Sequence, residues 1–313
     1  MSNVLSWNCR GLGSIPAVNA LRRVVINEKP QLVFLQETKL HSYEMERVKK
    51  RLNFRGMFVV DCVGDGRRRK GGVCLLWRED WDITILSFST NHIDSIVNAE
   101  GGMTWRFTGI YGFPETENKA KTGALLKTLH NRESMPWLCG GDFNLMLWSV
   151  EKQGGGDFRF EEAELFREAC DHCELYDLNY VGHPFTWTNN QGGDHNLQER
   201  LDRFLANSQW QTKFGHSYVT HLEKRRSDHL PILLSIRTKL PQSGKKRNKR
   251  LFRFEEMWTR EEECGEVIAA NWRKGGDAAV NVGRIASDLR EWSMAKFGDF
   301  AKEMRMLKEQ MGK

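Results

Sequence analysis

The stretch CGGDFNLML, residues 139–147, sets one carboxylate and one amide between two apolar runs. Two glycines come directly before Asp142, and Asn144 follows two residues later, so we expect an apolar strand that ends in a tight turn. This pattern has an ordinary explanation, because glycine reaches positive φ and Asp and Asn side chains hydrogen-bond to their own backbone. Whether these polar groups also carry a chemical function depends on the rest of the chain.

The composition predicts a packed protein surrounded by water. Of the 313 residues, 40% are hydrophobic and 28% are charged, which is ordinary for a folded domain. No apolar run approaches the roughly 18 residues that span a bilayer, so no membrane partner is expected. The N-terminal stretch MSNVLSWNCRG lacks the basic and apolar segments of a secretory signal. We therefore expect the nucleus or the cytoplasm, with the nucleus favoured.

Positive charge is unevenly distributed along the chain. The net charge is +6, and residues 241–313 hold 16 Lys and Arg against 12 Asp and Glu. Global charge is therefore a weak sign of nucleic-acid binding, and only local basic runs would contact phosphates. The candidates are GRRRKGG at 66–72 and KKRNKR at 245–250. The first also fits a solvated loop, and the second fits a nuclear import signal or a linker.

The seven cysteines are odd in number and scattered, and several lie in apolar runs. Buried free thiols explain this usage best. Cys170 and Cys173 form the closest pair, with His172 between them, but no second Cys or His pair stands at zinc-ligand spacing. The preceding FEEAELFREAC has a helical pattern, so both cysteines are expected on one helix face as structural residues.

Apolar patterns predict strands in groups, with helices between the groups. Helical patterns follow Pro16 and occupy HSYEMERVKKRL, NKAKTGALLKTLH and the segment at 161–174. This order favours an α/β class with two packed sheets and helices outside them. Strands are expected at 3–9, 31–37, 56–62, 71–77, 81–88, 93–99, 103–112, 135–144, 183–189, 200–207 and 227–236.

The pattern changes near residue 240. LPQSGKKRNKR is polar and basic, so 241–250 is expected to be a linker between a domain at 1–240 and a helical tail at 251–313. A tail helix that folds back is favoured over a partner-binding helix, and no obligate protein partner is evident. The apolar anchors of the tail would be three tryptophans, Trp258, Trp272 and Trp292.

Polar side chains stand where several predicted strands end. Such groups are costly at the edge of a buried sheet unless they pair or bind something. Their repeated placement is a common way to assemble an active site on rigid elements. A further carboxylate, Asp202, lies inside the apolar run RLDRFLA. The residues at strand ends are Asn8, Glu37, Tyr111, Asp142, Asn144, Asp228 and His229.

Carboxylates, amides and one histidine suit the hydrolysis of a phosphodiester. Mg²⁺ takes oxygen ligands, usually with one or two protein carboxylates, and Glu37 with Asn8 would supply them. A bound ion would offset negative charge on the phosphate and on the leaving oxygen.

The attacking water needs a base, and Asp142 is a good candidate if Asn144 fixes its orientation. His229 would donate to a phosphoryl oxygen or exchange a proton, provided that Asp202 holds its tautomer. Tyr111 would donate a hydrogen bond to the phosphate.

The order of these motifs resembles a known family, the endonuclease/exonuclease/phosphatase superfamily, which includes DNase I and the apurinic endonucleases. The resemblance covers roughly residues 3–237, and the motifs together are far more specific than any one of them. Three further stretches, LSWNCRGLG, HPFTWTN and RFEEMW, are similar to the endonuclease region of plant LINE-type non-LTR retrotransposons. The motifs are WN, QET, YG, GDFN, RLDRF and SDHLP.

The resemblance implies a four-layered α/β sandwich with two central mixed β-sheets and an active site at one edge. It also implies DNA as the partner and Mg²⁺ as the cofactor, which Mn²⁺ can replace. Metal ligands would be Glu37, Asn8 and Asp228, and the general base is left open between Asp142 and His229. The implied catalytic residues are Asp142, Asn144, His229, Asp202, Tyr111 and Asn8.

Two features depart from the family pattern. Two residues after Asn8, the apurinic endonucleases carry an Asp near the metal, whereas this chain carries Arg10. This weakens the expectation of abasic-site repair. The sequence also has no Tyr-x-Asp-Asp motif of a reverse transcriptase. The tail is therefore expected to be the start of a connector to a missing reverse transcriptase, in a truncated copy.

The sequence predicts a Mg²⁺-dependent phosphodiesterase, foremost a DNA endonuclease that nicks one strand in retrotransposon-type target cleavage. A catalytically decayed nucleic-acid-binding remnant is the alternative from another class. A phosphatase of the same superfamily is the alternative within it. Every expected polar residue is intact, which favours the enzyme.

Overall fold

Hydrophobic side chains alternate between two environments along the strands, and this alternation sets the layers of the fold. In β2 (Leu32–Gln36), Leu32 and Phe34 belong to one core cluster, and Val33 belongs to another. Successive side chains of a strand point to opposite faces, so the sheet is packed on both sides. The computed structural model of the chain describes residues 2–99, 103–130, 135–237 and 261–272, and the single residues 285, 288, 289, 292 and 296.

The chain divides into two compact units, Met1–Gln242 and Ser243–Lys313. Two large mixed sheets dominate the first unit. In the described part, the larger sheet has the order β11-β15-β16-β1-β2-β4-β3. Besides β2, its strands are β1 (Ser2–Asn8), β3 (Gly56–Val60), β4 (Val73–Trp77), β11 (Tyr180–Val181), β15 (Tyr218–His221) and β16 (Ile232–Ile236).

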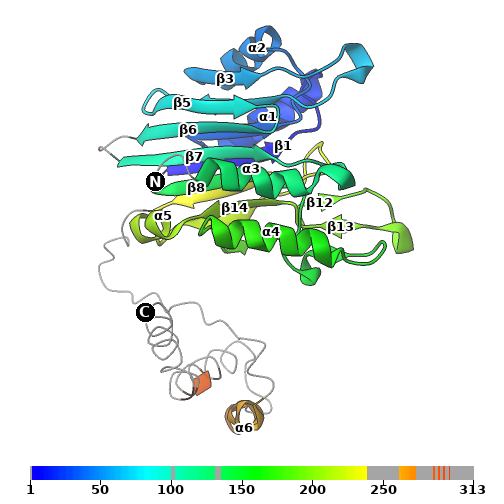
Figure 1. Cartoon of the computed structure of the whole chain (residues 1–313), viewed down its shortest axis with the longest axis vertical. Helices are drawn as coiled ribbons and strands as arrows, with labels where there is room; N and C mark the ends of the chain where they lie inside the picture. The colour runs from blue at the N-terminus through cyan, green and yellow to red at the C-terminus, as the bar shows by residue number, and fades with distance from the viewer. Residues whose placement is uncertain are drawn as a thin grey trace. The chain divides into compact units, whose positions relative to one another are not determined.

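The second large sheet has the order β10-β14-β8-β7-β6-β5. Its strands are β5 (Asp82–Ser89), β6 (His92–Ala99), β7 (Met103–Tyr111), β8 (Trp137–Asp142), β10 (Tyr176–Asp177) and β14 (Asp202–Ala206). A third, small sheet consists of β12 (Trp187–Thr188), β13 (Gln198–Glu199) and β9 (Lys152–Gln153). Figure 1 shows β5 to β8 and β14 in one row, with helices in front of them and β1 behind.

Helices cover the outer faces of the two large sheets. The longest helix in the described residues begins at the N-cap Ser14, whose side chain accepts from Ala17 N, and it has a proline in its first turn, where proline costs no hydrogen bond. The described helices of the first unit are α1 (Ile15–Glu28), α2 (Ser42–Leu52), α3 (Ala120–His130), α4 (Phe160–His172) and α5 (Ser208–Lys213), with 3₁₀ turns η1 (Gly66–Arg68), η2 (Thr116–Asn118), η3 (Ser149–Glu151) and η4 (Gly193–His195). The second unit contains α6 (Glu262–Asn271).

Three core clusters separate four layers in the first unit. Between the sheets, the rings of Phe34 and Phe107 meet edge to face at 6.2 Å. A second cluster joins β1, β2 and β4 to α1 and α2, and a third joins β7 and β8 to α3 and α4. Cys170 and Cys173 are buried free thiols in that third cluster. The expected four-layered α/β sandwich with two central mixed sheets is therefore confirmed.

Strand direction brings the polar residues to one edge. β1 runs parallel to β2, and β7 runs parallel to β8 with Tyr111 opposite Asp142. β14 is antiparallel to β8 and begins at Asp202, which also faces Asp142. Because the carboxyl ends of parallel strands lie at the same edge, Asn8 and the residue after β2, Glu37, reach the same region.

Two glycines allow the close approach of backbones under the turn at Asp142. A Cβ on Gly141, whose φ is +151°, would lie 1.9 Å from the carbonyl oxygen of Ile110. A Cβ on Gly112 would lie 2.0 Å from the carbonyl oxygen of Phe143. Both distances are far below van der Waals contact, so only glycine fits at either position.

Two expected strands are wrong in extent, and one of them is 227–236, of which only β16 is a strand. The segment 183–189 contributes only the two residues of β12. The backbone N–H groups of 183–189 hydrogen-bond to separate segments instead of one neighbouring strand: Thr186 N donates to Glu199 O, and Thr188 N donates to Asp228 O. This divided bonding places the segment between the small sheet and the loop before β16.

In the second unit, α6 buries Cys264 against Ile285 and Leu289, and the Lys296 ammonium pairs with Glu261 and Glu263. The predicted linker at 241–250 and the expected anchor Trp258 lie outside the described residues. No helix in the described part of the chain is both long enough and apolar enough to cross a membrane.

Candidate active site

The expected residues meet around a cavity of about 730 Å³. Four of them line it: Glu37, Tyr111, Asn144 and His229. The remaining residues, Asn8, Asp142, Asp202 and Asp228, do not line this cavity but contact residues that do. Buried hydrogen-bond donors and acceptors therefore lie beneath the side chains that line the cavity.

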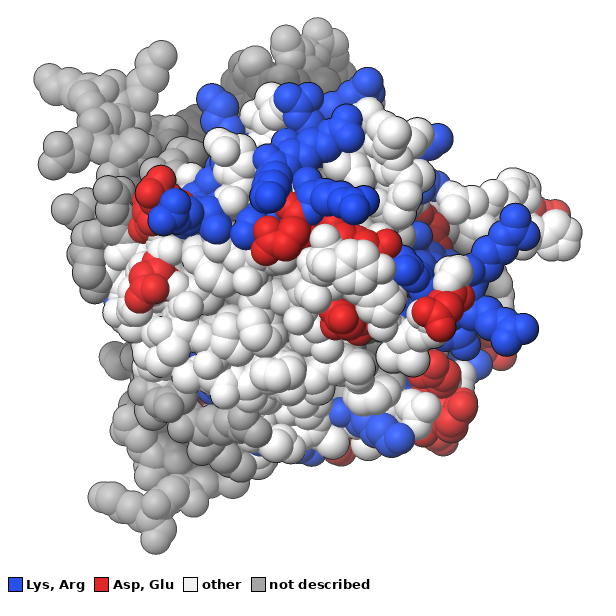
Figure 2. All heavy atoms as spheres, turned by 90° about the horizontal axis from the view of Figure 1, so that it is seen from above, with Lys and Arg blue, Asp and Glu red and all other residues white. Residues whose placement is uncertain are grey.

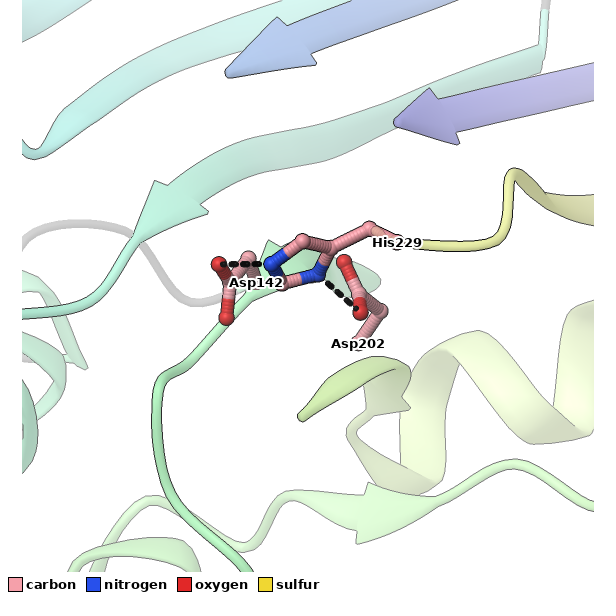
Figure 3. A group of neighbouring side chains, drawn as sticks. All are labelled: Asp142, Asp202 and His229. Atoms are coloured by element: carbon pink, nitrogen blue, oxygen red, sulfur yellow. Dashed lines mark hydrogen bonds and ion pairs between the residues drawn. The ribbon is translucent and has the colours of Figure 1, made fainter. Parts of the chain in front are cut away.

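His229 lies between two buried carboxylates. Its Nδ1 is 2.8 Å from Asp202 Oδ2, and its Nε2 is 3.8 Å from Asp142 Oδ2. Figure 3 shows the imidazole reaching from its loop to the two aspartates on neighbouring strands. Asp142 and Asp202 are each 1% exposed and His229 is 3% exposed, so water does little to screen these charges.

The loop that carries His229 is fixed to β1. Ser227 Oγ donates to Asn8 O at 2.7 Å and accepts from His229 N at 3.1 Å. Trp7 Nε1 donates to the carbonyl oxygen of His229 at 3.1 Å. The motif SDHLP therefore supplies its own anchor for the imidazole, and Trp7 packs beneath the site as a core residue.

Burial and mutual charge shift the pKa values of Asp142 and His229. Burial raises the pKa of Asp142 to about 6, with a further rise from Asp202, although His229 opposes it. Burial alone would lower the pKa of His229, but the Asp202 and Asp142 carboxylates outweigh it and raise the pKa to about 9. At neutral pH the arrangement favours a charged imidazolium beside a carboxylate of increased basicity.

Both oxygens of Asp142 are oriented by hydrogen bonds. Asn8 Nδ2 donates to Oδ2 at 2.9 Å, and the backbone N–H of Asn144 donates to Oδ1 at 2.9 Å. The Asn144 side chain instead donates from Nδ2 to Gly112 O at 2.9 Å, with a backbone φ of +52°. Asn144 thus orients Asp142 through its main chain, and its side chain holds the turn.

Glu37 projects into the cavity from a strained backbone, with a φ of +50°, a conformation that residues with a Cβ seldom adopt. Its Oε1 accepts from Asn8 Nδ2 at 3.3 Å and from the Tyr111 hydroxyl at 3.1 Å. Burial opposes its ionisation, but Arg10, Asn8 and Lys39 together lower its pKa. Because the Tyr111 hydroxyl donates to Glu37, it must give up this hydrogen bond before it can donate to a phosphate.

Asp228 links the site to a second cavity of about 520 Å³. Its Oδ2 accepts from Trp187 Nε1 at 3.0 Å, and its Oδ1 lies 3.1 Å from Arg10 Nε. Trp187 lines both cavities. Its ring therefore forms a wall between them, and its indole N–H fixes the carboxylate of Asp228.

The residues at Glu37 fit a divalent cation. One carboxylate with a neutral amide and a second carboxylate nearby is a donor set that Mg²⁺ accepts. The two cationic partners of Glu37 stand at long distances, 3.3 Å to Arg10 Nη1 and 3.4 Å to Lys39 Nζ, so an ion can take the place of these contacts. Asp142, Asp202 and His229 are also close enough to share a metal, with ligand atoms within 4.8 Å. The short Asp202–His229 hydrogen bond favours proton chemistry for that group.

Sequence reasoning missed a buried ion network behind the site. Arg203 donates to both Glu151 oxygens, at 3.0 and 2.9 Å, and Arg200 donates to Asp177 at 2.5 and 3.0 Å. Glu151 also accepts from Leu147 N at 2.6 Å, which ties the loop after Asn144 to β14. The only sequence signal was the pair of arginines that flanks Asp202 in RLDRF.

The rim of the cavity carries basic side chains. Four of them already have acidic partners: Arg10 and Lys39 lie beside Glu37, Arg69 lies 2.8 Å from Glu44, and Lys119 lies 3.1 Å from Glu162. Figure 2, a view onto the end of the molecule at the top of Figure 1, shows Lys and Arg gathered in groups with carboxylates beside them. The basic residues of the rim are Arg10, Lys39, Arg69, Lys70 and Lys119.

Solved structures share this architecture. The endonuclease domain of TRAS1, a telomere-specific non-LTR retrotransposon, is 17% identical with a TM-score of 0.54, and the match covers 76% of this chain and 99% of that one. The 3′ phosphatase NExo from Neisseria, bound to a product DNA hairpin, is 17% identical with a TM-score of 0.56 and covers 76% and 100%. The AP endonuclease LMAP from Leishmania major is 18% identical with a TM-score of 0.57 and covers 74% and 86%.

These identities establish the shared fold alone, and a search of curated proteins returned no significant match. A family model gives the stronger result. The model of the Endonuclease/Exonuclease/phosphatase family matches residues 5–229, a span that begins in β1 and ends on the histidine of the site. The chain therefore belongs to the endonuclease/exonuclease/phosphatase family.

Proposed function

We propose that this chain is a divalent-metal-dependent phosphodiesterase that nicks one strand of DNA. The observation that carries the proposal is His229, held at 2.8 Å by Asp202 and facing Asp142 across 3.8 Å. That gap is too long for a direct hydrogen bond, and it leaves room for a reacting group to contact both side chains.

In this proposal His229 acts as a charged donor. Asp202 Oδ2 accepts the hydrogen bond from His229 Nδ1, so Nε2 is the nitrogen that faces the cavity. The two carboxylates favour the imidazolium, which then donates from Nε2 to a phosphoryl oxygen as negative charge develops there. The roles of base and donor are thereby divided, and the base is Asp142.

Asp142 receives a proton from the attacking water. Asn8 and the Asn144 backbone fix its two oxygens, and burial makes its carboxylate more basic than usual. A base with a pKa near the working pH combines the right protonation state with driving force for proton transfer. Tyr111 lines the cavity beside Glu37 and donates to the phosphate once its bond to Glu37 is exchanged.

Glu37, Asn8 and Asp228 would hold Mg²⁺, or Mn²⁺ in its place. The ion supplies charge neutralisation at the scissile phosphate and the leaving oxygen. The basic rim around Arg69, Lys70 and neighbouring residues suits a phosphate backbone. The similarity to the TRAS1 endonuclease domain and the motif WNCRGLG support a retrotransposon-type nicking enzyme, and the nucleus is the compartment where this function would be needed.

A plasmid-nicking assay tests the proposal. Supercoiled DNA should become relaxed with Mg²⁺ and stay supercoiled with EDTA. Asp142→Asn should abolish nicking, and Asp171→Asn, the same change on an exposed part of α4, should not. Failure of the unaltered chain to nick while it still binds DNA would identify a non-catalytic binding protein. Release of phosphate from a 3′-phosphorylated strand without nicking would identify a phosphatase.

A further inference from the structure

Arg10 contacts every residue that we assign to the metal. Its Nη1 lies 3.3 Å from Glu37 Oε1, and its Nε lies 3.1 Å from Asp228 Oδ1. Its backbone N–H donates to Asn8 Oδ1 at 3.3 Å. A guanidinium offers several N–H groups in a fork, so one side chain can hold two carboxylates at once.

The backbone of Arg10 is shaped for this position. Its φ is +51°, in the left-handed region that a residue with a Cβ enters at a cost. The side chain is 48% exposed and lines the cavity, so it can leave the carboxylates without opening the core. Ion pairs with this much solvent contact contribute little each, and their exchange for another partner is inexpensive.

Lys39 provides an internal comparison. Its Nζ lies 3.4 Å from Glu37 Oε2, and its side chain is 35% exposed. It carries the same charge at nearly the same distance from Glu37 as Arg10, but no contact to Asp228 or Asn8 is found among the described residues. The two cations therefore differ in what they bridge, not in what they add to the local charge.

We propose that Arg10 is a built-in competitor for the divalent cation, and that it moves to the substrate phosphate when the ion binds. The inference rests on the proposed function, because it uses the same three ligands. The guanidinium contacts both Glu37 and Asp228, so an ion bound by these two carboxylates would have to displace it. A phosphodiester in the cavity offers Arg10 a new bidentate partner, so substrate and metal each favour the binding of the other.

Metal affinity of the full chain tests this directly. Binding of Mn²⁺ is measured by titration calorimetry on the unaltered chain, Arg10→Met and Lys39→Met, with thermal unfolding as the check on folding. Lys39→Met reports the effect of removing one positive charge. Arg10→Met should bind Mn²⁺ about tenfold more tightly than Lys39→Met, because it also removes the contacts that the ion must displace.

Adding a short nicked duplex, the expected product, should tighten Mn²⁺ binding to the unaltered chain more than to Arg10→Met. Equal affinities for the two variants would show that Arg10 acts as a charge alone, and weaker binding to Arg10→Met would show that it supports the ligands; either result overturns the inference. If the unaltered chain still nicks DNA with Mg²⁺, the proposed function stands. Absence of Mn²⁺ binding to all three chains removes both the metal site and the inference.

Discussion

Replacing Asp202 by Asn tests the most buried contact of the site. The substitution keeps the shape and an oxygen that accepts from His229 Nδ1, and it removes the charge that favours the imidazolium. Both residues are almost fully buried, with exposures of 1% and 3%, so solvent cannot replace that charge. Since Asp202 does not line the cavity, turnover should fall while substrate affinity changes little.

The magnitude follows from the contact. The 2.8 Å hydrogen bond joins ionised groups, and such a bond contributes about 1.5–3 kcal/mol. At about 1.4 kcal/mol for each factor of ten, turnover should fall about 10- to 150-fold. The same loss should lower the pKa of His229 by about 1–2 units, because the protonated form loses its stabilising charge. The alkaline limb of the pH–rate profile should therefore move to lower pH.

The assay is single-turnover nicking of a supercoiled plasmid across a range of pH. Asp177→Asn is the matched control, since it removes a carboxylate from the network around Arg200 and Arg203 without contacting His229. It should lower thermal stability and leave the profile unchanged. His229→Ala should cost at least as much turnover as Asp202→Asn.

The Asp202→Asn, His229→Ala double variant decides whether the pair acts as a unit. It should lose little more turnover than His229→Ala alone, because the aspartate works through the imidazole. Losses that add fully on a logarithmic scale would refute the reasoning. An unchanged alkaline limb in Asp202→Asn would refute it as well.

Further predictions concern the metal ligand Glu37, the two limbs of the pH–rate profile, the stability of the fold and the C-terminal tail. Glu37→Gln should fold normally and lose most nicking activity, with partial recovery at high Mg²⁺ or with Mn²⁺; unchanged nicking would exclude it as a ligand. Activity should rise with pH through about 6, as Asp142 loses its proton, and fall through about 9, as His229 loses its proton; a rise that continues past this range would contradict a protonated donor. Glu151→Gln should lower the free energy of unfolding by about 3–5 kcal/mol, because it removes the nearer of the two anions that neutralise the buried Arg203, as chemical denaturation would measure. Despite burial, the guanidinium groups of Arg203 and Arg200 lower the pKa of Glu151 to about 2, so its contribution is fully present above the usual glutamate pKa of 4.5 and is lost as pH falls through about 2. A chain of residues 1–240 should be soluble and active, and an insoluble product would show that the tail is needed for folding.

Much of the fold follows from local patterns. Continuous apolar runs in LVFLQ and VCLLW identify strands packed on both faces, because side chains of a strand point to opposite sides. Pro16 comes before the predicted helical pattern, and the structure places it in the first turn of α1. The segment at 183–189 misled the same reasoning, since its apolar pattern resembles a strand while its hydrogen bonds go to several separate segments.

Part of the candidate site could also be predicted from the sequence. Carboxylates and amides at strand ends identify Asn8, Glu37 and Asp142, because polar groups at such positions need partners. The sequence did not reveal what those partners are. Arg10 was visible only as a departure from a family pattern, and its contacts to Glu37 and Asp228 depend on a left-handed backbone that no motif encodes.

The sequence by itself determined the order of strands and helices, the chemical types available at the strand ends and the family to which they belong. Those properties depend on residues close together in the chain. The contact between Asp202 and His229 was expected from the sequence and is present at 2.8 Å, but the tertiary structure alone decided that Glu151 neutralises Arg203 and that Arg10 bridges two carboxylates. The partners of these contacts lie far apart in the sequence, with 27 positions between Arg10 and Glu37 and 52 between Glu151 and Arg203. The physical reason is that only the packing of two sheets against each other fixes which distant side chains share one low-dielectric space, and hence which charges they stabilise.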